Sequence, residues 1–107
     1  MVKMVEIRKI VLDVLKPHSP DIVSFAKNIA AVPGIDGVNI SVYEIDKEVE
    51  NVKITIVGKF RDMSEIKEVI SNIGGTIHSI DEVVAGRSMV GEEETLHERH
   101  HINPEWR

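Results

Sequence analysis

The chain has 107 residues, enough for one domain with a single hydrophobic core but too few for a second. Its 18 acidic and 13 basic side chains leave a net charge of −5, which repels nucleic-acid phosphates and anionic lipids. The sequence contains no local basic patch that would override this repulsion, and no cysteine for disulfides, thiolate metal sites or thiol catalysis. It also shows neither a signal peptide nor an apolar run long enough to span a membrane. We therefore expect a cytoplasmic protein that contacts neither nucleic acid nor membrane.

The first predicted element is a strand over residues 7–15, which is apolar on both of its faces. Pro17 ends this strand, and a helix runs from there to about residue 32. We expect Ser19 to cap this helix, Pro20 to occupy its first turn and Asp21 to interact with the positive end of its dipole. Apolar residues recur at helical spacing and predict one buried stripe, formed by Ile22, Phe25, Ala26, Ile29 and Ala30.

Two strands with strict alternation follow, one starting at Val38 and one around Val52. The short polar segment 46–51 between them predicts a hairpin. A second helix begins near Asp62, where Glu65 is placed for a capping box, and ends at residues 74–75. A last strand covers residues 76–82. This order predicts an α+β ferredoxin-like βαββαβ sandwich, with a four-stranded antiparallel sheet and two helices on one face.

The sheet face without helices is the more informative one. Alternation assigns nine side chains to it, apolar in the middle and polar around: Val11, Asp13, Leu15, Asn39, Ser41, Tyr43, Lys53, Thr55 and Val57. An ordinary exposed face is one interpretation, since single apolar residues are common at protein surfaces. We favour burial against another copy of the chain, or under the C-terminal tail, because the first strand should be central and is apolar on both sides. We therefore expect a homo-oligomer.

Three segments carry a resemblance to a known family: residues 12–18 (LDVLKPH), 37–46 (GVNISVYEID) and 78–86 (HSIDEVVAG). Together they resemble the archaeal family catalogued as domain of unknown function 211. The resemblance covers roughly the first 87 residues and implies a ferredoxin-like sandwich that tends to self-associate, with no family activity. We accordingly predict one domain over residues 1–87. The charged, histidine-containing tail over residues 88–107 is predicted to be flexible or to contact a partner.

The hairpin carries a candidate site for a divalent cation. Asp46, Glu48 and Glu50 alternate like the first three ligand positions of a calcium loop, and calcium or magnesium prefers several such oxygens. The pattern is incomplete, because Asn51 takes the place of the sharp-turn glycine and Val57 that of the closing glutamate. A solvated hairpin tip is the interpretation that we favour, although a neighbouring copy could supply the missing ligands of a cation site. No other feature of the sequence requires a cofactor.

A carboxylate, Asp13, lies in the middle of the apolar first strand, where a buried charge needs a compensating cation or donor. We expect Lys53 of a neighbouring strand to form an ion pair with it. The alternative is a ligand contact, in which Asp13 joins other polar side chains around a small polar ligand. That candidate ligand site consists of Asp13, Asn39, Ser41, Tyr43 and His78.

The histidines are candidate acid–base or metal-binding groups. His18 and His78 have side chains of the type used for acid–base chemistry, but no motif places a nucleophile beside either, and a hydrogen-bonded or exposed ring is the interpretation that we favour. In the tail, four residues have the helical spacing of a zinc or nickel site: Glu93, His97, His100 and His101. A disordered or partner-contacting tail is favoured over that metal site.

These features favour a non-enzymatic, self-associating module that binds a small ligand or a divalent cation. RNA recognition is disfavoured because the central strands lack stacking aromatic residues, and copper transfer because cysteine is missing. Acylphosphatase-like catalysis lacks its arginine-containing phosphate loop. Two alternatives stay open: a small enzyme whose site lies at a subunit boundary and uses Asp13 with His78 or His18, and an adaptor that binds a protein through the tail.

Overall fold

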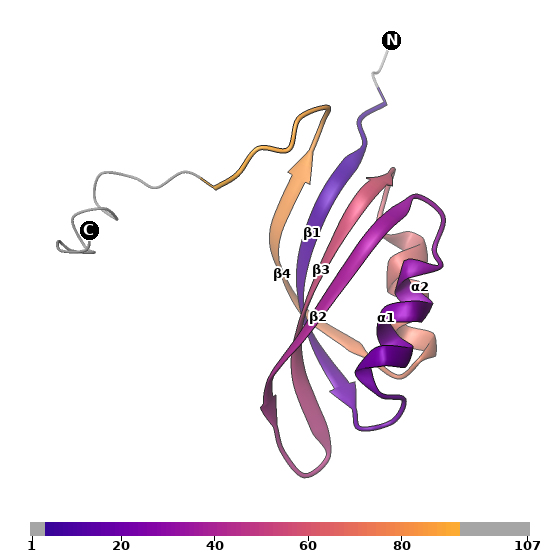
Figure 1. The fold of residues 1–107 in the computed structure, drawn as a ribbon, viewed down its shortest axis with the longest axis vertical. Coiled ribbons are helices and arrows are strands. Elements are labelled where there is room, and N and C mark those ends of the chain that lie inside the picture. Colours follow the sequence, from indigo (N-terminus) through magenta and orange to yellow (C-terminus); the bar gives the residue numbers. More distant parts are fainter. Residues whose placement is uncertain (1–3, 93–107) are drawn as a thin grey trace, which may run out of the picture.

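The computed structural model describes residues 4–92 and shows one antiparallel sheet with two helices on one of its faces (Figure 1). In chain order the elements are β1 (Ile7–Pro17), α1 (Ile22–Ala30), β2 (Ile35–Ile45), β3 (Val49–Phe60), α2 (Ser64–Asn72) and β4 (Thr76–Ala85). The four strands lie in the order β2-β3-β1-β4, so β1 and β3 are central. The α+β ferredoxin-like arrangement predicted from the sequence is confirmed.

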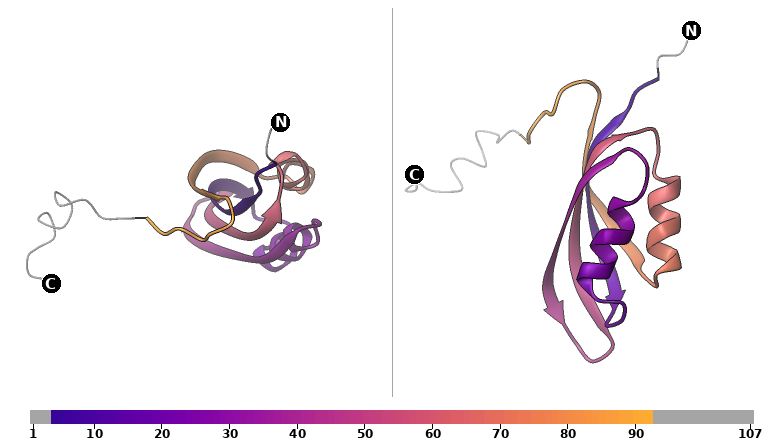
Figure 2. Two further views of the ribbon diagram at one scale, coloured as in Figure 1. Left: turned by 90° about the horizontal axis from the view of Figure 1, so that it is seen from above. Right: turned by 45° about the vertical axis from the view of Figure 1, so that its right-hand side comes forward.

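The hydrophobic core lies between the helices and the sheet (Figure 2). Alternating side chains of the two central strands point toward the helices, and each nine-residue helix buries one stripe against them. The fully buried members are Ile10, Leu12 and Val14 of β1, Val52, Ile54 and Ile56 of β3, and Phe25, Ile29, Ile66 and Ile70 of the helices. No helix within residues 4–92 is long and apolar enough to cross a membrane.

The strands are longer than the sequence pattern predicted. β1 continues to Pro17 instead of ending at residue 15, because Lys16 pairs with Glu50 and Pro17 with Val49 across the hairpin. β2 begins at Ile35 and β4 ends at Ala85, whereas α1 ends at Ala30, two residues before its predicted end. Proline is tolerated at the last position of a strand, where its missing N–H interrupts little of the ladder.

The helix caps also differ from the prediction. Asp21, and not Ser19, caps α1: its carboxylate accepts a hydrogen bond from the backbone N–H of Ser24 at 2.9 Å. At the start of α2, Asp62 accepts a hydrogen bond from the N–H of Ser64 at 2.9 Å, and Met63 is the cap residue without a side-chain bond. The capping box predicted for Glu65 is therefore wrong, because the cap residue is Met63 and Glu65 follows it by two residues instead of the three that a capping box requires.

Two glycines allow β2 and β3 to approach closely at one end of the sheet. Gly34 has a φ of 91° and its carbonyl oxygen accepts a hydrogen bond from the N–H of Lys59 at 2.7 Å. A Cβ atom on Gly58 would collide with that same carbonyl oxygen. The backbone of residues 58–59 is thus held tightly against the start of β2.

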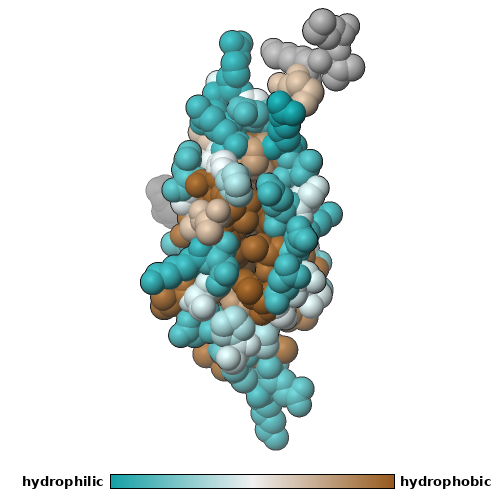
Figure 3. All heavy atoms as spheres, turned by 90° about the vertical axis from the view of Figure 1, so that its right-hand side faces the viewer, coloured by the Kyte–Doolittle hydropathy of each residue, from teal (hydrophilic) through white to brown (hydrophobic). Residues whose placement is uncertain are grey.

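On the helix-bearing side of the molecule, a strip of apolar side chains reaches the surface between hydrophilic margins (Figure 3). Val23 of α1 is the most exposed large aliphatic residue of either helix, at 59%. The core beneath the helices is nevertheless complete, since Phe25 and Ile29 of the same helix are fully buried.

Leu12 provides a direct test of this core. Leu12→Ala removes a fully buried side chain of the central strand, and the cavity left behind should lower the free energy of unfolding by about 2–5 kcal/mol. Urea denaturation measures this change. Val23→Ala on the exposed surface of α1 is the matched control and should stay within about 0.5 kcal/mol of the parent. Equal effects of the two substitutions would contradict the described packing.

Candidate functional site

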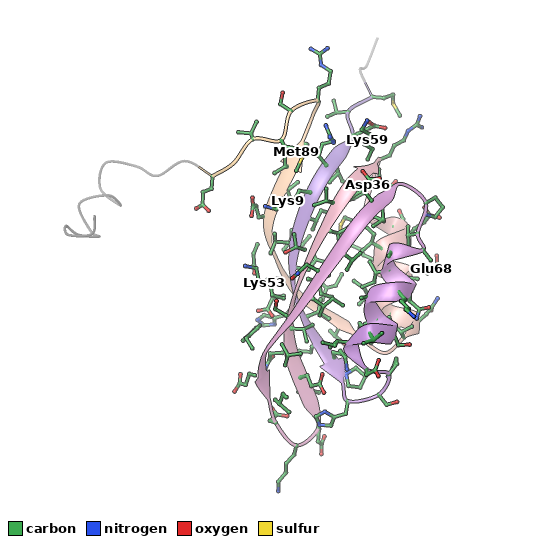
Figure 4. All side chains as sticks on the ribbon, viewed as in Figure 1. Lys9, Asp36, Lys53, Lys59, Glu68 and Met89 are labelled. Atoms are coloured by element: carbon green, nitrogen blue, oxygen red, sulfur yellow. The ribbon has the colours of Figure 1, made fainter. Side chains whose placement is uncertain are left out.

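The face of the sheet that points away from the helices, here called the open face, carries the polar cluster predicted around Asp13. Strand register places Lys53 directly opposite both Asp13 and Ser41, and Thr55 opposite both Val11 and Asn39. Figure 4 shows Lys53, together with Lys9, on this side of the sheet. The assignment of these side chains to one face is therefore confirmed.

Asp13 binds a different partner from the one predicted. The hydroxyl of Tyr43 reaches across β3 and donates a hydrogen bond to Oδ1 of Asp13 at 2.5 Å. Lys53 is opposite Asp13 in register, yet within residues 4–92 no ion pair joins the two side chains. The compensating group for Asp13 is thus a phenol donor, and the ammonium of Lys53 points to solvent.

The remaining predicted ligand residues divide into two groups. Ser41 donates a hydrogen bond to Asn39 at 3.3 Å on the same face as Asp13 and Tyr43. His78 lies apart from them, because it lines a shallow hollow of about 510 Å³ together with Lys67 and other residues of α2 and β4. The structure therefore brings four of the five predicted residues onto one face and places His78 beside a helix.

The contact with Asp13 changes the pKa of the Tyr43 hydroxyl. The hydrogen bond to Asp13, followed by partial burial and the negative charge of the carboxylate, raises the pKa of Tyr43 from 10.0 to about 12. The phenol therefore stays protonated at neutral pH and acts only as a donor to Asp13. One oxygen of the carboxylate is occupied by this bond.

A second polar site, which the sequence pattern did not indicate, lies at the far end of β1. The side chain of Lys16 is fully buried on the helix side of the sheet, with its Nζ 5.2 Å from the centre of the Phe25 ring. The Nζ atom donates to the carbonyl of Pro17 at 2.6 Å and lies 3.1 Å from Oε1 of Glu50. This buried ammonium is neutralised and hydrogen-bonded, as a buried charge must be.

Glu50 joins Lys16 to His18. Its second oxygen lies 3.0 Å from Nδ1 of His18, and Nε2 of the same ring lies 3.0 Å from the carbonyl oxygen of Lys47. A neutral imidazole has only one N–H, so both contacts are hydrogen bonds only when the ring is protonated. We describe these groups, Lys16, His18 and Glu50, as the hairpin clasp, because they tie the end of β1 to the β2–β3 hairpin.

The electrostatics of the hairpin clasp favour charged forms of its groups. The hydrogen bond with Glu50, aided by the carbonyl of Lys47, raises the pKa of His18 above its usual value of 6.5. The hydrogen bonds from His18 and then from Lys16 lower the pKa of Glu50 below 4.5. The carboxylate is therefore ionised near neutral pH and is already bound to two cations.

The predicted cation site at the hairpin is not formed within one chain. Asp46 accepts hydrogen bonds from the N–H groups of Glu48 and Val49, both at 3.1 Å, and the bond from Val49 is the main reason why the pKa of Asp46 is lowered. Glu50 belongs to the hairpin clasp. In the part of the chain that the structure describes, no group of three or more histidine, aspartate or glutamate side chains is arranged to hold a metal ion. Calcium or magnesium binding by Asp46, Glu48 and Glu50 stays a prediction.

The acid–base pairs considered for an enzyme are not brought together either. His18 is bound to Glu50 at one end of the sheet, and His78 lines the hollow beside α2, whereas Asp13 is bound to Tyr43 on the open face. The candidate metal residues of the tail, Glu93, His97, His100 and His101, lie outside the described residues.

One signal could have revealed Lys16. It continues the alternation that directs Ile10, Leu12 and Val14 toward the helices. A strand that extends to Pro17 therefore places the Lys16 side chain in the core. Pro17 is a common stop signal, and a strand that ends at residue 15 leaves Lys16 outside the sheet, so the sequence pattern does not indicate its burial.

Comparison with known proteins agrees with the resemblance seen in the sequence. The family model for domain of unknown function 211, described as uncharacterized ArCR, matches residues 8–99. The chain belongs to the domain of unknown function 211 family. The uncharacterized protein MJ0319 of Methanocaldococcus jannaschii is 58% identical over 94 residues, which cover 88% of this chain and 97% of that protein.

The family match extends farther than we expected. The resemblance in the sequence covers roughly the first 87 residues, whereas the match to domain of unknown function 211 reaches residue 99. The family segment therefore includes part of the tail as well as the sandwich from Arg8 onward. It also includes Asp13, Tyr43 and all three residues of the hairpin clasp.

The contact between Tyr43 and Asp13 can be tested by titration, because the chain has a single tyrosine. Alkaline absorbance titration of the parent should show half-ionisation at a pH of about 12. Asp13→Asn removes the negative charge and should move the midpoint toward 10.0, whereas Asp36→Asn at an exposed position should leave it unchanged. A parent midpoint at 10.0 in protein that is still folded by circular dichroism would show that the bond is not formed.

The hairpin clasp predicts a specific dependence of stability on pH. Because the folded-state pKa of His18 is raised, its stabilising contribution is complete below 6.5 and is lost as pH rises through the folded value. Glu50 has a lowered pKa, so its contribution is present above 4.5 and is lost at lower pH. The clasp should therefore contribute most between about pH 4.5 and 6.5.

Urea denaturation on both sides of pH 6.5 tests this expectation. His18→Gln should remove part of the decrease in stability that the parent shows as the pH rises above 6.5. His78→Gln, which alters an exposed histidine outside the clasp, should keep the pH profile of the parent. The described clasp is wrong if both variants show the same profile.

Proposed function

We propose that this protein is a self-associating binding module, in which the open face of one copy packs against the open face of a second. The observation that carries the proposal is the apolar centre of this face. Val11 of β1 and Val84 of β4 are only 5% and 6% exposed, although no helix covers them, and Leu15 and Val57 on the same face are half-buried. Such a centre surrounded by polar groups is typical of protein interfaces.

The size of the open face supports a second copy as its partner. A strand of 11 residues spans about 36 Å, and four strands spaced by about 4.8 Å span about 19 Å, so the face offers about 700 Å² per copy. A stable interface of ordinary size uses about 800 Å² per partner. The two values are close enough for one face to serve as a complete interface.

The open face carries both a positive and a negative side chain, so two copies can pack with opposite charges in contact. Lys53 is exposed and has no ion-pair partner within residues 4–92, and it lies directly opposite the carboxylate of Asp13. A two-fold axis between two copies lets the lysine of one copy face the carboxylate of the other, twice per dimer. Tyr43, which is 58% exposed, adds an aromatic side chain of a type enriched at interfaces.

Light scattering tests the proposal. The parent should have a molar mass at least twice the 12.0 kDa of one chain. Lys53→Glu should weaken association at least about tenfold, because it places carboxylates of the two copies against each other. The measurement is made with calcium and with a chelator, so that cation-dependent assembly is also detected.

Lys67→Glu is the matched control, since it makes the same charge change at an exposed position of α2. This variant should have the same molar mass in solution as the parent. A parent mass of 12.0 kDa at all concentrations, or an equal effect of the two variants, would overturn the proposal.

A further inference from the structure

Four cationic side chains surround one cavity at the end of the sheet where β1 begins and where β3 and β4 end. The cavity has a volume of about 410 Å³ and is lined by Arg8, Lys59, Arg61 and Arg87. Figure 4 shows Lys59 at this end of the molecule, beyond the position of Lys9 along the sheet. Glu6 is the only carboxylate among the lining residues, so the lining carries a net charge of +3.

This basic cluster is unexpected in a chain with a net charge of −5. The sequence shows no basic patch, because Arg8 and Arg87 are 79 positions apart and are separated from Lys59 and Arg61 by long segments. The antiparallel pairing of β1 with both β3 and β4 brings these segments together.

The four cations have no anionic partner in the described chain. Within residues 4–92, none of them lies within ion-pair distance of a carboxylate, whereas Lys9 is paired with Glu82 and Lys16 with Glu50. Asp62 follows Arg61 in the sequence, but it is hydrogen-bonded to the N–H of Ser64. Several like charges around one hollow repel one another, and a bound anion would relieve that repulsion.

Arg8 is held in place by the backbone. It lies at an irregularity in the pairing of β1 with both neighbouring strands, a feature that redirects side chains and is common beside binding sites. Its Nε donates to the carbonyl of Gly58 at 3.3 Å and its Nη1 to the carbonyl of Arg87 at 2.9 Å. Gly58 is itself fixed by its close approach to Gly34. The half-buried guanidinium is thus oriented, and three of its five N–H groups remain for a ligand.

We propose that this cavity binds a small molecule carrying a diphosphate group. Guanidinium groups match phosphate oxygens in geometry and charge, and several of them are needed to neutralise two adjacent phosphates. The volume lies within the range of about 300–1,000 Å³ that is usual for small-ligand sites. Met4 and Val5 line the same cavity and are 63% and 51% exposed, which provides apolar surface for an organic group attached to the diphosphate.

The size and surroundings of the cluster favour a small ligand over a long polyanion. A nucleic acid would extend beyond the four cations onto a surface that is negative overall. The cavity also lies at the end of the sheet and not on the open face, so this inference does not depend on self-association.

Isothermal titration of the full chain with inorganic pyrophosphate and with adenosine diphosphate, both in the presence of a chelator, tests the inference. At least one of the two should bind with a dissociation constant of about 1 mM or below. The double variant Arg61→Gln and Arg87→Gln should weaken that binding at least about tenfold. Both residues are exposed, so this variant should fold like the parent, which circular dichroism checks.

The matched control is the double variant Lys27→Gln and Lys67→Gln, which removes two exposed positive charges on the helices and should retain parental binding. Equal binding of the two probes would identify the diphosphate as the recognised group, and tighter binding of adenosine diphosphate would add a contribution from its organic part. The inference fails if neither probe binds, or if both double variants lose affinity equally. Binding of single-stranded DNA without binding of either probe would also overturn it.

Discussion

The position of β1 between β3 and β4 is the constraint on which the rest of the structure depends. Because both neighbours are antiparallel to β1 and cover its two edges, every second side chain of β1 faces the helices and every other one faces the open side. One strand therefore supplies both the centre of the core, through Leu12, and the centre of the open face, through Val11 and Asp13.

The two ends of β1 each carry a positively charged side chain, but the surroundings of the two charges differ. Lys16 at one end is fully buried and has Glu50 as its counter-ion, so its charge is neutralised internally at the junction with the hairpin. Arg8 at the other end is oriented by two carbonyl oxygens and has no carboxylate partner in the described chain. Internal neutralisation makes the first a structural group, whereas the excess positive charge makes the second available to a ligand.

Periodicity in the sequence was sufficient for the order of the elements, the two faces of the sheet and most of the core. It was less reliable at the ends of the elements, where two plausible signals compete. Ser19 and Asp21 are both good cap residues, and only the position of the first helical turn selects Asp21. Pro17 is both a common stop signal and an acceptable last residue of a strand, and this ambiguity concealed the burial of Lys16.

The sequence by itself determined the fold class and the faces of the side chains in the regular parts of β1, β2 and β3, because alternation and helical spacing are local properties of the chain. The tertiary structure alone decided which polar groups became partners. Asp13 is hydrogen-bonded to Tyr43 and not paired with Lys53, Glu50 is shared by Lys16 and His18, and Arg8 meets a carbonyl 79 positions away. These choices depend on strand register, on irregularities in pairing and on the reach of individual side chains. Such quantities exist only once residues distant in sequence lie side by side.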